Sequence, residues 1–512
     1  MFLKLAMLAV FFAVTVAIGI ACRKSAVDVR GFVLGGRNVG PWLTAFAYGT
    51  SYFSAVVFVG YAGQFGWKYG IASTWIGIGN SLIGSALAWA LLGRRTRILT
   101  QHLKSATMPE YFGRRFDSRG LKIAASLIIF IFLIPYTASL YNGLSRLFSM
   151  AFHMDYTVCI ILMSVLTAVY VVAGGYLASA INDFIQGIIM LGGIIAVVAA
   201  VLRLNGGFSE AIRLLSLVPG EGTTQAGVFT SFFGPDPINL LGVVLLTSLG
   251  TWGLPQMVGK FYAVTDEDAI KKGTVISTIF AFVIAGGCYF LGGFARLYAG
   301  RIDLAADGYD AIIPAMISDL SPLLIGVVVI LVLSASVSTL SSLVLTSAST
   351  LTLDFIKELF NRSMKQKTQL LLIRLMVVVF IVISGVLAVI QYRSNVTFIA
   401  QLMGVSWGAL AGAFLAPFLY SLYGRWVSRS AVAVSFAFGV GMMLWNLLAR
   451  SSLPVLLQSP LNCGAFTMLA GLLLVPAVSA VSRKLPSAFT ENIFACYEQK
   501  VETTAKSSLG DR

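Results

Sequence analysis

The chain has 512 residues, of which 58% are hydrophobic and 11% are charged, and its mean hydropathy is +0.87. Soluble globular domains carry about 25% charged residues, so this composition excludes an ordinary soluble protein and indicates a polytopic membrane protein. A net charge of +15 would favour nucleic acid as a partner of a soluble chain, but here we expect the lipid bilayer as the partner and no nucleic acid.

Uncharged runs long enough to cross a bilayer recur along the chain and predict an all-α protein with about thirteen transmembrane helices. About three quarters of the 36 Lys and Arg residues fall in alternate connections. By the positive-inside rule, this bias predicts an amino terminus outside and a cytoplasmic carboxyl terminus. We therefore expect a multi-pass protein of the inner or plasma membrane, and its oligomeric state stays open.

The amino-terminal apolar run continues into a basic loop without a small-residue cleavage site, so we expect a retained first helix. That loop ends in Leu34-Gly35-Gly36-Arg37, a turn whose cation is either a charge anchor or a functional group. The basic segment 94–122 has apolar residues at helical spacing. It is typical of an interfacial helix that lies against anionic lipid.

The run from Asn38 to Trp67 carries no charged side chain, yet its middle is small and hydroxylic, with the sequence GTSYFS at 49–54. Glycine and hydroxyl residues at mid-depth favour a helix that breaks there. The carbonyls freed by a break would be costly in hydrocarbon, so they must line a protein cavity or hold a ligand. We interpret this segment as half of a binding site.

Three further residues between the first break and residue 202 are of types that are often functional inside a membrane. Pro135 can kink the span 123–148 and turn polar neighbours inward, and Tyr136 then either contacts a solute or packs between helices. Asp183 lies within an apolar run. Acids at membrane depth usually mark ion or proton paths, although a hydrated or paired carboxylate is the alternative.

A second hydrophobic segment, 237–259, is interrupted by Gly250, Gly253 and Pro255. Two interrupted spans, each beginning a set of five, are typical of transporters built from inverted repeats. The expected divisions are 1–30 (first helix and basic loop), 31–203 (first five-helix repeat), 204–236 (extracellular connection), 237–421 (second five-helix repeat), 422–482 (two peripheral helices) and 483–512 (cytoplasmic tail).

Five of the nine residues from Ser334 to Ser342 carry hydroxyls, within a span otherwise built from Leu, Val and Ile. Ser338 and Ser342 share one helix face, with Thr339 and Ala335 beside them. Hydroxyls opposite broken-helix carbonyls offer hard oxygen ligands to sodium, whereas soft metals need Cys or His. The alternative is that these hydroxyls serve close helix packing.

The chain resembles the sodium:solute symporter family, especially proline and pantothenate permeases. The motifs that carry this resemblance are, in order, GRNVGPWLTAFAYGTSYFSA, GGYLASAINDFIQG, GTWGLPQMVGKF and SVSTLSS, and it covers roughly 25–420. It implies a LeuT-like core of two inverted five-helix repeats, with one helix before the core and two after it.

The resemblance also implies sites for sodium and for the solute. Its main sodium site matches Thr50, Phe53, Ala335, Ser338 and Thr339, and a second site matches Asp183, Ser338, Ser341 and Ser342. Its substrate positions match Tyr52, Ser54, Tyr136, Thr251, Trp252 and Trp407. Proline carriers place an acid at the position of Tyr52, so the chain departs from them there and is closer to pantothenate carriers.

We therefore expect a sodium-coupled symporter that imports a small organic solute such as a monocarboxylate, pantothenate or an amino acid like proline. No Arg or Lys is expected at mid-membrane to pair a carboxylate, so half-helix amino ends and hydroxyls would hold it. A proton-coupled permease of the same fold, which would depend on Asp183, is one alternative. A membrane sensor is another, and no set of residues typical of an enzyme is present.

Overall fold

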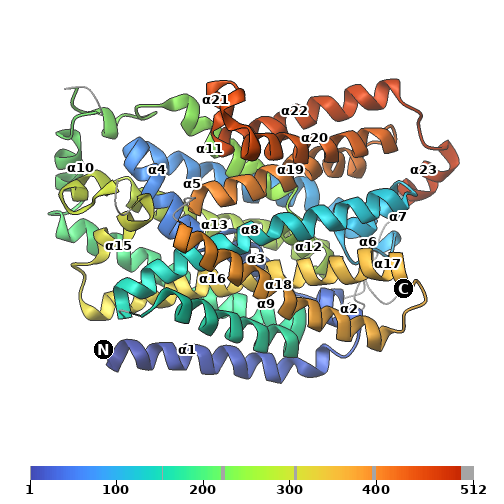
Figure 1. Ribbon diagram of the computed structural model, residues 1–512, viewed down its shortest axis with the longest axis horizontal. Helices are drawn as coiled ribbons and strands as arrows, with labels where there is room; N and C mark the ends of the chain where they lie inside the picture. Colours follow the sequence, from blue (N-terminus) through green and yellow to red (C-terminus); the bar gives the residue numbers. More distant parts are fainter. Residues whose placement is uncertain (1, 153, 221–224, 305–307, 395–398, 498–512) are drawn as a thin grey trace.

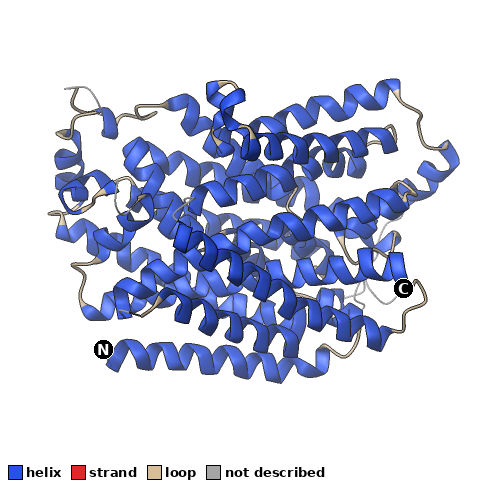
Figure 2. Cartoon of the chain, in the orientation of Figure 1, coloured by secondary structure: helices blue, strands red, loops and turns tan. Residues whose placement is uncertain are grey.

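A computed structural model describes residues 2–152, 154–220, 225–304, 308–394 and 399–497. Across these residues the chain is helical and contains no β-strand beyond one isolated bridge between Val39 and Val264 (Figure 2). The predicted tail 483–512 lies outside the described residues from position 498 onward. The all-α fold class is confirmed.

The helices run mainly along one common axis (Figure 1). The amino-terminal half contains α1 (Phe2–Ala21), α2 (Val29–Leu34), α3 (Pro41–Tyr52), α4 (Ala62–Tyr69), α5 (Thr74–Ser81), α6 (Arg94–His102), α7 (Met108–Arg115), α8 (Arg119–Phe152), α9 (Tyr156–Leu204) and α10 (Phe208–Ser216). The remainder contains α11 (Pro237–Leu249), α12 (Pro255–Ala263), α13 (Glu267–Gly292), α15 (Ile312–Ile317), α16 (Pro322–Thr350), α17 (Lys357–Phe360), α18 (Gln366–Ser394), α19 (Ile399–Tyr423), α20 (Arg429–Leu448), α21 (Val455–Gln458), α22 (Pro460–Val481) and α23 (Ser487–Phe494).

Ten helices among the described residues are long and apolar enough to cross a membrane, and the bent pair α11 and α12 makes an eleventh candidate. Two of the ten, Val56–His102 and Tyr156–Leu204, have 47 and 49 residues, more than one bilayer crossing needs. The chain turns inside each of them, at Gly70 (φ +60°) and Gly175 (φ +57°). The number thirteen therefore stays a prediction, as does the division into two five-helix repeats.

Both predicted interruptions are present. Helix α3 ends at Tyr52, Phe53 is extended (φ −106°, ψ 107°), and helical backbone resumes at Ala55 (φ −53°, ψ −30°). The Ser54 hydroxyl accepts the Val56 N–H at 3.2 Å and so satisfies one of the free donors at the start of the new helical segment.

The second interruption lies between α11 and α12, whose axes differ by 41°. A single 3₁₀ turn, Gly250–Trp252, follows α11, and Leu254 is extended (φ −79°, ψ 122°) before Pro255. Proline disfavours a helical conformation for the residue before it and fits the first position of a new helix. The Leu254-Pro255 pair therefore explains why this helix ends and restarts.

The first broken segment lies inside the bundle, where α3 packs on α9, α13 and α16. Helix α1 packs on α9 and α16 along one edge of the molecule, while α20 and α22 pack on α19 at the opposite edge (Figure 1). Helix α10 lies at one end of the bundle, and α2, α7, α17 and α23 lie at the other. We call this second end the basic end, because the Lys- and Arg-rich connections meet there.

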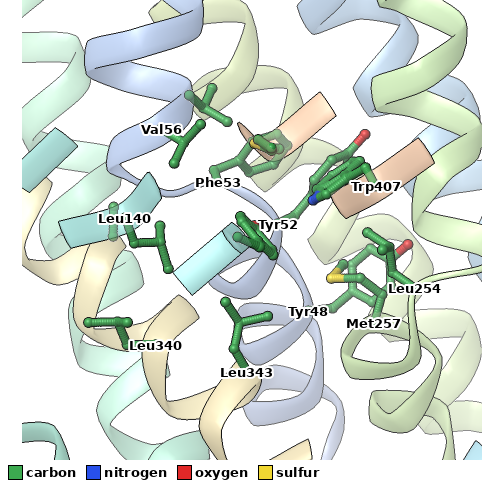
Figure 3. Close-up of a cluster of buried hydrophobic side chains, with 14 of the residues drawn as sticks. Tyr48, Tyr52, Phe53, Val56, Leu140, Leu254, Met257, Leu340, Leu343 and Trp407 are labelled. Carbon is green, nitrogen blue, oxygen red and sulfur yellow. The ribbon is translucent and has the colours of Figure 1, made fainter. Parts of the chain in front are cut away.

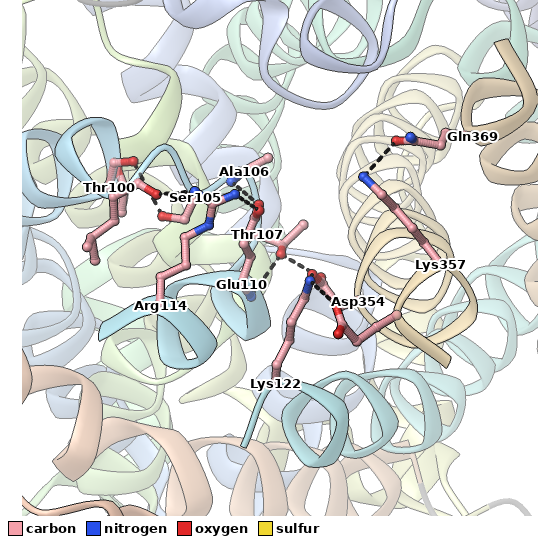
Figure 4. Close-up of polar contacts among 12 residues, drawn as sticks. Thr100, Ser105, Ala106, Thr107, Glu110, Arg114, Lys122, Asp354, Lys357 and Gln369 are labelled. Carbon is pink, nitrogen blue, oxygen red and sulfur yellow. Dashed lines mark hydrogen bonds and ion pairs between the residues drawn. The ribbon is translucent and has the colours of Figure 1, made fainter. Parts of the chain in front are cut away.

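The segment 94–122 differs from its prediction as one interfacial helix. It forms α6 and α7, and Arg97 and Arg115 are fully buried in the bundle. Thr107 caps α7 by accepting the Glu110 N–H at 3.2 Å and donates to the carboxylate of Asp354 in the helical turn that follows α16 (Figure 4). Lys122 lies 3.5 Å from the same carboxylate. These buried polar contacts hold the segment against the bundle, which periodicity alone does not reveal.

Candidate functional site

The carbonyl of Thr50, at the end of α3, faces the hydroxyl-bearing side of α16. The Ser338 and Thr339 hydroxyls donate to this carbonyl at 3.1 and 3.0 Å, and both also donate to the Ala335 carbonyl at 3.1 and 2.9 Å. All four residues are buried. Four oxygen atoms from two helices therefore converge at the first break.

This oxygen cluster has the chemistry that a sodium ion requires. A hydroxyl that donates to a carbonyl keeps its own lone pairs, so all four atoms can turn oxygen electrons toward a hard cation. Phe53, the fifth predicted ligand, lines a small cavity with Ala335. The residues predicted for the main sodium site are thus brought together, and their role as ligands remains a proposal.

The residues predicted for a second sodium site have a different arrangement. Asp183 on α9 is fully buried, and its Oδ2 lies 3.6 Å from the Nζ of Lys260. Lys260 Nζ also donates to the Ser342 hydroxyl at 2.9 Å, and that hydroxyl lies 2.7 Å from the Ser51 hydroxyl. Ser341 instead donates back to the Ser338 carbonyl at 2.8 Å.

The sequence led us to expect no Lys or Arg at mid-membrane, and the structure places one lysine, Lys260, inside the bundle beside Asp183. Lys260 follows an uncharged run directly, so charge counting assigns it to a connection. The second interruption redirects the chain, and α12 carries Lys260 into the bundle, where its side chain is only 4% exposed. Sequence reasoning also missed Ser51, although it lies next to Thr50 within the predicted break.

Three of the predicted substrate residues form one aromatic cluster. The ring of Trp407 lies 6.1 Å from that of Tyr52 in a stacked orientation (Figure 3). It lies 5.9 Å from the ring of Tyr136, edge to face. The Tyr136 hydroxyl faces Ser54 and Trp407. Neither this hydroxyl nor the Trp407 indole N–H makes a hydrogen bond within the described part of the chain. These two buried groups lie close to each other without a hydrogen bond of normal geometry, and so have hydrogen-bonding capacity that a solute can use.

The remaining predicted substrate residues, Thr251 and Trp252, lie at the second break and contact the backbone of residues 83–84. Thr251 donates to the Gly84 carbonyl at 3.0 Å, and the Trp252 indole donates to the Ile83 carbonyl at 3.0 Å. A Cβ at Gly84 would lie 2.3 Å from the Tyr52 hydroxyl. A side chain at position 84 would therefore displace the Tyr52 hydroxyl from its place beside the Gly84 backbone.

The turn before α3 is tied to the last turn of α12, to α6 and to the residues that follow α6. Arg37 donates to the carbonyls of Ser105 at 2.5 Å, Thr100 at 3.3 Å and Tyr262 at 3.5 Å, and burial lowers the pKa of its guanidinium to about 10. Val39 N–H donates to the Ala263 carbonyl at 3.1 Å. Arg37 is thus a buried link between helices rather than a surface charge anchor.

Comparison with known proteins agrees with this architecture. A family model described as the sodium:solute symporter family matches residues 32–437. The osmoregulated proline transporter OpuE of Bacillus subtilis is 29% identical over 443 residues, which cover 86% of this chain and 87% of that protein. The sodium/proline symporter of Staphylococcus aureus (strain JH9) is 29% identical over 446 residues, covering 85% of this chain and 83% of that protein.

Two solved structures share the fold. A Na⁺-coupled sialic acid symporter in a substrate-bound outward-open state has a TM-score of 0.73 at 17% identity, covering 94% of this chain and 98% of that protein. Mhp1, a nucleobase-cation-symport-1 family transporter in a closed conformation, has a TM-score of 0.52 at 14% identity, and the match covers 90% of this chain and 97% of that protein. The predicted LeuT-like fold class is confirmed. The chain belongs to the sodium:solute symporter family and is a sodium-coupled multi-pass membrane transporter of a small solute, not an enzyme.

Proposed function

We propose that the protein imports a small organic solute bearing a carboxylate, such as a monocarboxylate, pantothenate or an amino acid like proline. The relatives named as proline carriers support an amino-acid-like solute. The aromatic cluster of Tyr52, Tyr136 and Trp407 suits a compact apolar body, and its two buried hydrogen-bonding groups suit polar groups. The start of the second half of the first broken helix, at Ser54, offers N–H groups to a carboxylate.

One observation carries the coupling mechanism: the Thr50 carbonyl accepts hydrogen bonds from both Ser338 and Thr339. A sodium ion at these oxygens, with the carbonyls of Phe53 and Ala335, would hold α3 against α16. Because Tyr52 and Ser54 lie on either side of Phe53, this ion would also fix the solute-facing residues. Sodium binding would thereby complete the solute site.

The driving force is adequate for accumulation of the solute. One sodium charge that crosses a potential of ~100 mV releases about 2.3 kcal/mol, before its concentration gradient is counted. That free energy supports a concentration ratio of roughly fiftyfold. The proposed orientation, with the amino terminus outside and the basic end in the cytoplasm, follows the charge bias of the connections. Inward sodium flow would then import the solute.

The test is solute uptake into proteoliposomes that contain the purified protein. Candidate solutes are first screened for thermal stabilisation of the protein in sodium but not in choline. The double variant Ser338→Ala/Thr339→Ala should then raise the half-saturating sodium concentration by roughly a hundredfold, because each of the two hydroxyl contacts to a charge contributes about 1.5 kcal/mol.

Ser336→Ala is the matched control, since the Ser336 hydroxyl bonds back to the Val332 carbonyl at 2.8 Å within α16. It should leave the sodium dependence of uptake unchanged. Equal uptake in choline and sodium would contradict the proposal and favour a proton-coupled permease. An unaltered sodium requirement in the double variant would reject the placement of the ion.

A further inference from the structure

The buried amine of Lys260 lies at the centre of contacts that link four helices, α3, α9, α12 and α16. Its Nζ contacts Asp183 of α9 at 3.6 Å and Ser342 of α16 at 2.9 Å, and Ser342 in turn contacts Ser51 of α3 at 2.7 Å. Lys260 itself belongs to α12, the second half of the second broken helix. The two interrupted segments are thus linked through Lys260 and the Ser342 hydroxyl.

The ammonium group lies among oxygen atoms that would otherwise form a cation site. Asp183 and Ser342 are the carboxylate and one of the hydroxyls predicted to bind a second sodium ion, and both are now directed at Lys260. Ser341, a further predicted ligand, bonds back to its own helix. The carboxylate and the Ser342 hydroxyl are therefore already engaged with a positive charge.

The charge balance leads to the same conclusion. The Asp183 carboxylate is fully buried, and its oxygens make no hydrogen bond among the described residues, so its recorded partner is the Lys260 charge. A sodium ion added beside this pair would leave a net positive charge in a medium of low dielectric constant, which is strongly disfavoured. One carboxylate can balance one cation, and the chain supplies that cation itself.

A cavity lies beside Lys260. Lys260 and Ser342 line it together with Tyr176, Ser179 and Gln256. The Ser179 hydroxyl and the Gln256 amide are buried and have no hydrogen-bond partner among the described residues. Unpaired polar groups of this kind are usually hydrated. A cation could therefore reach Asp183 once the lysine charge is removed.

We propose that Lys260 is a tethered cation that takes the place of a second sodium ion, so that each solute is coupled to one sodium. This inference rests on the proposed function, because it presumes that one sodium binds at Thr50, Ala335, Ser338 and Thr339. Lys260 thereby joins α12 to α9 and α16 throughout the cycle, a task that a second ion would perform only while bound.

The first experiment measures the stoichiometry of the unaltered protein, from the reversal potential of solute-driven sodium flux in proteoliposomes and from sodium titration of the purified protein. We expect one sodium per solute and a Hill coefficient for sodium of 1. A stoichiometry of two would overturn the Lys260 inference and leave sodium coupling intact. Failure to bind sodium at all would instead overturn the proposed function.

The second experiment removes the tethered charge. Lys260→Ala should open the site near Asp183, so that sodium titration shows an additional site and the Hill coefficient rises toward 2. The double variant Lys260→Ala/Asp183→Asn should return the Hill coefficient for sodium to 1. Lys260→Arg keeps the positive charge, so its Hill coefficient should stay at 1. A folded Lys260→Ala protein with a single sodium site would overturn the inference. If Lys260→Ala does not fold, the sodium-to-solute stoichiometry of the unaltered protein is the measurement that tests the inference.

Discussion

The Tyr52 hydroxyl donates a hydrogen bond of 2.6 Å to the carbonyl of Thr247. Tyr52 is the last residue of α3, and Thr247 lies in the last turn of α11, so this bond joins the two interrupted segments directly. Carbonyls in the last turn of a helix have no partner within the helix. Tyr52 thus satisfies a buried acceptor that the second break leaves free.

Tyr52→Phe should therefore weaken solute transport as well as the fold. We expect a loss of about 1–3 kcal/mol in stability, because a buried carbonyl loses its donor, and a higher KM for the solute, because the ring is no longer anchored. The measurements are thermal unfolding in detergent and initial uptake rates. Tyr420→Phe is the control, since it removes a similar bond of 2.9 Å to Leu472 between α19 and α22. An equal KM in both variants would contradict the prediction.

Tyr136→Phe should weaken solute binding while leaving the stability of the protein almost unchanged. The Tyr136 hydroxyl is buried without a hydrogen-bond partner among the described residues, so its removal should change the free energy of unfolding by less than about 0.5 kcal/mol. The KM for the solute should rise if this hydroxyl binds it. Tyr141→Phe on the same helix loses a bond of 3.1 Å from Ser164 and should cost about 1 kcal/mol. A destabilised Tyr136→Phe protein with normal uptake would show a structural role only.

Removal of one member of the Lys260 and Asp183 pair should destabilise the protein strongly. Lys260→Met leaves a buried carboxylate without its counter-charge, a change that costs about 3–5 kcal/mol. Lys260→Met/Asp183→Asn should recover much of that loss, because neither charge remains. Thermal unfolding is compared in choline buffer, so that no sodium compensates Asp183. If the double variant is less stable than Lys260→Met, the two side chains do not act as a pair.

Gly66→Ala should disrupt the packing of α4 on α13. A Cβ at Gly66 would lie 1.9 Å from the Gly292 carbonyl oxygen. Because the clash is with backbone, the helices must separate, which costs about 1–3 kcal/mol or more. The yield of folded protein and its melting temperature measure this effect. Gly286→Ala on α13 meets nothing within 4 Å and should be tolerated. Equal stability of the two variants would reject the close approach.

Local sequence signals were sufficient to predict those features that depend only on the conformation of neighbouring residues. Pro255 cannot continue a helix and restricts Leu254, so the second break is visible in the sequence. The spacing of Ser338, Thr339 and Ala335 places their oxygens on one helix face. The charge pattern of the connections similarly predicted a membrane protein with a basic end. Each of these inferences depends on neighbouring residues alone.

Tertiary structure decided the features that depend on where a helix points after it restarts. Charge counting assigned Lys260 to a connection, yet the 41° bend between α11 and α12 directs it toward Asp183. Arg37 likewise became a buried link because Ser105 and Tyr262 present carbonyls to it. The sequence by itself determined the all-α membrane class, where two helices break and which face of α16 carries hydroxyls. Which charges meet inside the bundle was decided only by the packing of distant helices, because a buried charge is stable only where another segment supplies its partner.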